Sequence, residues 1–195
     1  MGVRCRALTE EEFQVCMASF GGKYENRDRA LFLLMGMTGW RVSEVLSLTL
    51  GDVVKDGAVV DRVTVQKRNC KGKRRGKDKV LRPEVRSALA AWIKELHAAG
   101  YMTKDAYLFQ SRVGSNKPIS RMQVHRVLKE AYEANELIGN VACHSLRKYF
   151  GERVYRASGH DLVATQMLLD HSSVESTRRY LDVGKEELDE LVLNC

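Results

Sequence analysis

The sequence contains few of the features that interrupt or repeat folded structure. It has only two prolines, Pro83 and Pro118, in 195 residues, and it shows no internal repeat, no low-complexity tract and no stretch that resembles a domain linker. A chain of this length can bury a hydrophobic core as one large domain or as two small ones. We therefore expect an ordinary globular protein, as the hydrophobic fraction of 44% and the charged fraction of 29% also indicate.

Cysteine is present, but in no pattern typical of disulfide frameworks or zinc ribbons. The cysteines are odd in number and no two are spaced as CxxC; they are Cys5, Cys16, Cys70, Cys143 and Cys195. This favours a reducing compartment. The strongest apolar run, residues 30–35, has the size of a core helix, and the N-terminus shows no signal-peptide pattern. The sequence thus predicts a cytoplasmic protein without a membrane segment.

Positive charge is abundant and locally concentrated. The formal net charge is +7, and between residues 62 and 82 Asp78 is the single acidic residue. The basic residues of this stretch are Arg62, Lys67, Arg68, Lys71, Lys73, Arg74, Arg75, Lys77, Lys79 and Arg82. Such a local excess favours a polyanionic partner, most simply nucleic acid. Because β-type segments flank the lysine-rich part, we expect it to be an exposed hairpin loop.

Apolar spacing and capping signals predict a mostly helical α+β domain. Thr9 and Glu12 form a capping box before the first helix, Pro83 suits the start of a long helix, and Ser120 caps another. Further helices are expected at about residues 25–37, 42–48, 83–97, 145–156, 162–169, 174–180 and 186–193. Strands are expected at 58–60, 63–66 and 79–81. The predicted fold packs these helices around one small antiparallel β-sheet.

Four scattered residues have side chains suited to phosphate chemistry. His144 and Arg147 lie three apart at a helix start, so they share a face and can hold one phosphate. His171 follows a predicted helix, and Tyr180 ends another helix with arginines beside it, which stabilise a phenolate. Taken singly, each also fits an ordinary role: a helix-surface pair, a loop histidine and a packed tyrosine.

Arg41, far upstream, starts a predicted helix, with Glu44 three residues later. The simplest interpretation of this spacing is a salt bridge between the two side chains. The alternative is a functional one, in which Glu44 is a supporting carboxylate that orients neighbouring catalytic side chains. In either case, Trp40 and Leu46 are expected in the core.

Three segments together resemble the catalytic domain of the tyrosine recombinases, the integrase family of phages and mobile elements. They are TGWRVSEVLSL at residues 38–48, HSLRKYF at 144–150 and LLDHSSVESTRRYLDV at 168–183. They occur in the family's order and at its usual spacings, and they frame nearly the whole chain. The resemblance implies a site-specific DNA recombinase or integrase with the catalytic-domain fold of that family.

The resemblance also implies a role for each matching position. Tyr180 would be the nucleophile that becomes joined to a DNA 3′-phosphate, and Arg41 and Arg147 would bind that phosphate. His144 would act as general base and orienting group, and His171 would donate a hydrogen bond to the phosphate. Glu44 would support the site. No metal ion or other cofactor is expected, because the phosphotyrosine bond conserves the free energy of the bond that is broken.

The family's general acid is a lysine in the hairpin between two strands, where this chain is unusually basic. We expect Lys71 in this role, with Lys73 and Lys67 as alternatives. The hairpin residues expected to contact the DNA backbone are Lys67, Arg68, Lys73, Arg74, Arg75 and Lys77. The resemblance therefore identifies double-stranded DNA as the partner.

The chain departs from the family pattern in two ways. Asp170 stands before His171 where glycine is typical; aspartate tolerates the left-handed conformation expected there, so we expect little loss. The family normally has a separate N-terminal DNA-binding domain, and this chain is expected to start where that domain would end. We therefore expect residues 1–195 to be a single catalytic domain, either an excised fragment or a short family member.

The family resemblance further implies a homotetramer on DNA, in which the C-terminal helix docks on a neighbouring protomer, with a monomer in isolation. That helix carries Leu188, Leu191 and Val192. The alternative is that it folds back on its own domain.

Three other functions compete with recombination. A type IB topoisomerase uses the same chemistry to relax supercoils, and a non-catalytic basic module would bind DNA without cleaving it. A metal site at Cys143, His144 and His171 lacks regular ligand spacing and is disfavoured.

Overall fold

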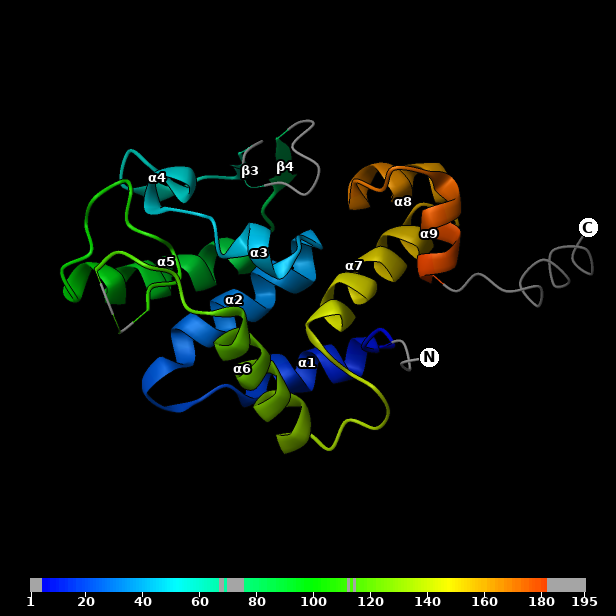
Figure 1. The fold of residues 1–195 in the computed structure, drawn as a ribbon, viewed down its shortest axis with the longest axis horizontal. Coiled ribbons are helices and arrows are strands. Elements are labelled where there is room, and N and C mark those ends of the chain that lie inside the picture. The colour runs from blue at the N-terminus through cyan, green and yellow to red at the C-terminus, as the bar shows by residue number, and fades with distance from the viewer. Residues whose placement is uncertain (1–4, 67–68, 70–75, 112, 114, 182–195) are drawn as a thin grey trace, which may run out of the picture. The chain divides into compact units, whose positions relative to one another are not determined.

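The fold is described from a computed structural model of the chain (Figure 1), which describes residues 5–66, 69, 76–111, 113 and 115–181. Its contacts divide the chain into two compact units, residues 1–149 and residues 150–195. The division falls within helix α7, Cys143–Ala157. The two units are treated separately below.

The first unit is mainly helical. Its helices, besides the start of α7, are α1 (Glu10–Ser19), the 3-10 helix η1 (Gly22–Tyr24), α2 (Glu25–Thr38), α3 (Val42–Val45), α4 (Leu50–Val53), α5 (Pro83–Ala98) and α6 (Arg121–Ala134). The capping box before α1 is confirmed: Glu12 N donates to Thr9 Oγ1 (3.1 Å), and Thr9 N donates to the Glu12 carboxylate (2.9 Å). Ser120 caps α6 as predicted, accepting from Gln123 N at 3.1 Å. Helix α3 is shorter than predicted, and α4 was not predicted.

The strands form two separate antiparallel pairs. Strand β1 (Val54–Lys55) pairs with β2 (Ala58–Val59), and β3 (Arg62–Val65) pairs with β4 (Lys77–Val80). Alternate residues of β3, Val63 and Val65, are buried, as expected for a strand with one face toward the core. The predicted fold class, mostly helical with a small antiparallel component, is confirmed. The predicted single sheet is divided into two ladders in the described part of the chain.

The core of the first unit lies between helices that are distant in sequence. Helices α2 and α5 run side by side in Figure 1, and α1 packs against both α2 and α6. The ring of Phe13 stacks on those of Phe32 (centroids 4.8 Å apart) and Tyr149 (4.2 Å). A Cβ at Gly36 would lie 2.3 Å from the Phe13 ring, so only glycine allows α2 to approach α1 this closely. This packing fixes the end of α2, where Arg41 follows.

The second unit comprises the end of α7, then α8 (Leu162–Leu169) and α9 (Val174–Leu181), which pack against each other. The bounds of α8 match the prediction, and those of α9 differ by one residue. Asp170 ends α8 in the left-handed conformation (φ 52°, ψ 43°), as expected for the position where glycine is typical. The predicted helix at 186–193 lies outside the described residues. No helix in the described part of the chain is both long and apolar enough to cross a membrane.

Candidate active site

Arg41 is held in place by a buried carboxylate. It precedes α3, and Glu44 accepts from Arg41 N at 2.8 Å and from Arg41 Nη1 at 3.3 Å. The Glu44 side chain is fully buried (0% exposed), whereas that of Arg41 is 25% exposed. The predicted salt bridge is therefore present, and the functional interpretation of Glu44 stays a prediction. Trp40 and Leu46 are buried, as predicted.

Arg147 is brought to the same segment from α7. Its Nη1 donates a hydrogen bond to the carbonyl oxygen of Gly39, two residues before Arg41. Gly39 has φ 64° and its N–H donates to Met35 O at 3.0 Å, which closes α2. Glycine adopts this left-handed conformation at little cost. Although 106 positions separate Arg41 from Arg147 in the sequence, the structure anchors both at the end of one helix.

His144 and Arg147 differ sharply in burial. Arg147 is 4% exposed, and His144 is exposed at the first turn of α7. Between them, Ser145 Oγ accepts from Ala142 N at 2.9 Å, which fixes the start of the helix. The exposed imidazole can meet a large substrate, and the buried guanidinium is a fixed charge. The predicted pairing on one phosphate remains a prediction.

The second unit contains a compact group around Tyr180. His171 Nδ1 lies 3.0 Å from Thr177 Oγ1, and the rings of His171 and Tyr180 meet edge to face with centroids 5.0 Å apart. Thr177 Oγ1 also reaches Ser173 O at 3.5 Å. With its hydroxyl hydrogen directed there, Thr177 accepts from His171 and favours the Nδ1–H tautomer. The backbone of His171 is fixed to α8, since its N–H donates to Gln166 O at 3.1 Å.

Gly151 and Thr177 support this group and were not singled out from the sequence. A Cβ at Gly151 would lie 3.1 Å from Leu169 Cδ1 and 3.5 Å from Tyr180 Cε1, so the glycine lets α7 lie against the tyrosine ring. A glycine inside a helix costs stability and often has a packing reason. That signal, in FGERV at residues 150–154, was available in the sequence.

The basic hairpin is described only at its base. Asp78, the single acid of the basic stretch, pairs with Arg62 across the β3–β4 ladder, and Arg62 lowers the pKa of that carboxyl. Lys79 is buried (8% exposed) and so is not one of the solvent-facing cations. Strand β4 includes the backbone of Lys77. The lysine predicted as general acid and the other predicted DNA contacts lie outside the described residues; they are Lys67, Arg68, Lys71, Lys73, Arg74 and Arg75.

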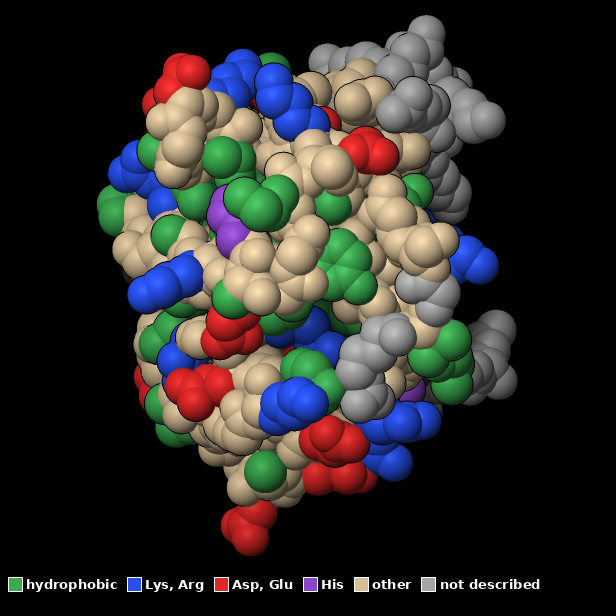
Figure 2. Space-filling model, turned by 90° about the vertical axis from the view of Figure 1, so that its left-hand side faces the viewer, with side chains coloured by type: hydrophobic (Ala, Val, Ile, Leu, Met, Phe, Trp, Pro, Cys, Tyr) green, Lys and Arg blue, Asp and Glu red, His purple; other side chains and the backbone are tan. Residues whose placement is uncertain are grey.

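Charge on another face of the molecule is mixed. In Figure 2, blue and red side chains are interspersed over the face that it shows, so the surplus of basic residues forms no single-sign patch there.

Within the described ranges, no group of three or more His, Cys, Asp or Glu residues is arranged to hold a metal ion. Burial raises the pKa of the Cys143 thiol, which disfavours the thiolate that metals bind.

The predicted residues therefore form two groups. Arg41, Glu44, His144 and Arg147 lie in the first unit, and His171 and Tyr180 lie in the second. Fixed guanidiniums are suited to an anionic substrate, and a phenol beside an imidazole is suited to nucleophilic attack.

The fold is shared with a solved structure. It is similar to the crystal structure of XerH site-specific recombinase bound to palindromic difH substrate, with a TM-score of 0.75 and 24% sequence identity. The match covers 96% of this chain and 52% of that chain. At this identity the likeness establishes the fold.

Sequence comparison establishes the family. The model of the Phage integrase family matches residues 6–187, and this chain belongs to that family. "Probable integrase/recombinase YoeC" of Bacillus subtilis (strain 168) is 32% identical, and the match covers 82% of this chain and 80% of that protein. Tyrosine recombinase XerC of Rhodospirillum centenum is 34% identical, covering 83% of this chain and 44% of XerC. The chain thus spans less than half of the length of that longer relative.

Proposed function

We propose that this chain cleaves and rejoins DNA strands through a covalent 3′-phosphotyrosine, as the catalytic part of a site-specific recombinase or integrase. The observation that carries the proposal is the hydrogen bond from Arg147 to Gly39 O, because it fixes a buried arginine beside the segment that begins with Arg41. Membership of the phage integrase family supports the same conclusion.

In the proposed reaction, Arg41 and Arg147 bind the non-bridging oxygens of the scissile phosphate. Charge grows on these oxygens in the transition state, so fixed guanidiniums stabilise it more than the ground state. The Tyr180 oxygen attacks phosphorus, its proton passes to His144, and the bond to the 5′-oxygen breaks. His171 donates to the phosphate from Nε2, consistent with its Nδ1 contact to Thr177, when the ring is protonated.

A lysine of the basic hairpin protonates the departing 5′-oxygen, and Lys71 is the proposed residue. Attack by a 5′-hydroxyl of a partner strand on the phosphotyrosine then reverses the steps and reseals the backbone. The tyrosine is regenerated, so bonds and protons balance without ATP or a metal ion.

Double-stranded DNA is the proposed substrate and partner. The net charge of +7 and the basic hairpin support this, and the XerH structure contains a DNA substrate. We further propose assembly as a homotetramer on DNA in which the C-terminal helix, with Leu188, Leu191 and Val192, docks on a neighbouring protomer. Gel filtration with and without DNA would test this, and a monomer in both conditions would contradict it.

The test of the proposed chemistry is incubation with nicked suicide DNA, which traps the covalent intermediate, followed by mass mapping of the adduct. The adduct should map to Tyr180, and Tyr180→Phe should abolish it while duplex binding stays close to normal. Tyr155→Phe, at another tyrosine of the second unit, is the matched control and should keep the adduct. Persistence of the adduct in Tyr180→Phe would exclude that nucleophile. Absence of any adduct from the unmodified chain, with salt-sensitive DNA binding retained, would indicate a binding module instead.

A further inference from the structure

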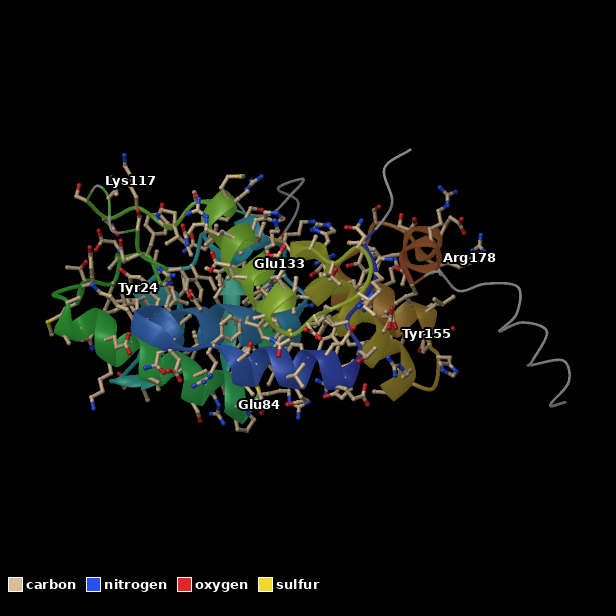
Figure 3. All side chains as sticks on the ribbon, turned by 90° about the horizontal axis from the view of Figure 1, so that it is seen from below. Tyr24, Glu84, Lys117, Glu133, Tyr155 and Arg178 are labelled. Carbon is tan, nitrogen blue, oxygen red and sulfur yellow. The ribbon has the colours of Figure 1, made fainter. Side chains whose placement is uncertain are left out.

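The outward side of α9 carries a three-residue ion cluster that the proposed chemistry does not use. The Glu175 carboxylate accepts from Arg178 through Nε (3.0 Å) and Nη2 (3.3 Å), and from Arg179 through Nε (2.8 Å). All three side chains are open to solvent: Glu175 is 48% exposed, Arg178 51% and Arg179 69%. Figure 3 shows Arg178 extending outward from the helix.

This cluster has more positive than negative charge. One carboxylate is shared by two guanidiniums, and no other ion pair to either arginine occurs among the described residues. Arg178 and then Arg179 lower the pKa of Glu175 to about 2, so the carboxylate stays charged at neutral pH. The cluster therefore has one uncompensated positive charge, directly before Tyr180 in the sequence.

The two arginines differ in their position around the helix axis. Successive residues of an α-helix are rotated by about 100°. Tyr180 and Thr177 share the side that faces His171, as their contacts with its ring show. Measured from Tyr180 alone, Arg179 lies about 100° away around the helix axis, whereas Arg178 lies about 160° away, nearly opposite the tyrosine. A strand held at Tyr180 is thus within reach of Arg179 far more readily than of Arg178.

We propose that Arg179 contacts a DNA phosphate adjacent to the scissile one, and that Glu175 holds its guanidinium until the strand binds. This inference rests on the proposed function, since it takes the strand to be held at Tyr180. Exposed ion pairs are weak, so a phosphate can displace the carboxylate. Arg178 remains on Glu175 and keeps that carboxylate paired after Arg179 has moved. Glu175 and Arg178 are positioning residues, and Arg179 is the binding residue.

The experiment measures duplex binding across a salt series with Tyr180→Phe in every variant, so that cleavage does not interfere. Arg179→Gln should weaken binding about tenfold and make the slope of log K against log salt shallower by about 1, as expected for one lost phosphate contact. Arg178→Gln should weaken binding less than about threefold. Glu175→Gln should tighten binding several-fold, because Arg179 no longer has to leave a carboxylate.

The matched control is Glu152→Gln. Glu152 also pairs with an arginine four residues on, Arg156, at 3.5 Å in the same unit, and its replacement changes the net charge equally. If the Glu152 and Glu175 variants bind DNA equally more tightly, the cause is the change in net charge alone, and the proposal is overturned. Equal losses from the two arginine variants would also overturn it. Adduct formation by the unmodified chain is measured in a separate experiment, which tests the proposed function. If adducts form while Arg179→Gln binds normally, only this inference fails; if none form, the proposed function fails.

Discussion

The two groups of candidate catalytic residues are held in different ways. In the first unit, Arg147 donates to the carbonyl oxygen of Gly39, 108 positions away, and Arg41 pairs with the fully buried Glu44 three residues on. In the second unit, His171 and Tyr180 lie nine residues apart, their rings meet edge to face, and Thr177 on the helix of Tyr180 contacts His171 Nδ1 through its hydroxyl. The arginines proposed to bind phosphate are therefore held within a large unit, and the proposed nucleophile lies in a short local arrangement.

This difference agrees with what each group is proposed to do. Charges that stabilise a transition state are most effective when they are already in position, which a densely packed core provides. A nucleophile that becomes covalently attached to DNA has to move with its strand, and a short helix with mostly local contacts allows such motion. We expect substitutions of the candidate site residues in the first unit to affect rate and stability together, and those in the second unit to affect rate alone.

The largest expected effect is from Arg147→Ala. The change removes a buried charge that binds Gly39 O, so we expect the single-turnover rate of adduct formation to fall about 100- to 1000-fold. Thermal stability should fall too, because the Gly39 carbonyl loses its donor. DNA affinity should fall less than about tenfold. Equal losses in rate and affinity would make Arg147 only a phosphate contact and would remove the distinction between the two groups.

A smaller effect, confined to rate, is expected from Thr177→Val. Valine preserves the shape of this buried side chain but offers no acceptor to His171 Nδ1–H, so the protonated ring that donates from Nε2 in the proposed reaction loses a stabilising partner. Adduct formation should slow about tenfold, with a melting temperature within about 2 °C of the original. Thr177→Ser keeps the hydroxyl and should retain most of the rate. If serine is as slow as valine, the contribution of Thr177 is packing alone.

The smallest effect, on stability alone, is expected from Glu12→Gln in the first unit. Glu12 receives charge-assisted hydrogen bonds from Arg6 at 2.6 Å, and this contact is the main cause of its lowered pKa. A carboxyl with a lowered pKa stabilises the fold above its unfolded value of 4.5, and this contribution is lost as the pH falls through the folded pKa. Glutamine should therefore cost about 1 kcal/mol at pH 7 and less at pH 3. Denaturant titrations at both pH values measure this, and a cost independent of pH would exclude the ion pair as its cause.

Much of the fold was predictable because its signals are local. Thr9 with Glu12, Pro83 and Ser120 each mark a helix start within a few residues, and the observed helices begin there. Helix α4 was missed although it also has a local signal: Thr49 and Asp52 form a capping box in which Thr49 N donates to the Asp52 carboxylate at 2.8 Å. The N–H of Leu50 also donates to Ala106 O, 56 positions away, and no local pattern reports that bond.

The site was predictable in part, for a similar reason. The residue types and their order indicated phosphate chemistry, and the family resemblance gave each position a role. The acceptor of Arg147 could not be predicted, because it is a main-chain oxygen and leaves no mark on the sequence. Thr177 was missed because a threonine in a short helix is ordinary until the histidine ring beside it is seen.

The peptide at Gly39 has a practical consequence for mutational surveys. The Gly39 N–H closes α2 and the Gly39 carbonyl oxygen accepts from Arg147, so one residue both ends a helix and positions a buried charge of the first unit. Replacing side chains one at a time leaves the Gly39 oxygen in place. Such a scan would attribute the whole loss of rate and stability to the arginine side chain. An ester bond in place of the Trp40 amide weakens the Gly39 carbonyl as an acceptor and removes the Trp40 N–H that donates to Thr38 Oγ1 at 3.3 Å, without altering any side chain. It would measure the combined contribution of these two backbone groups.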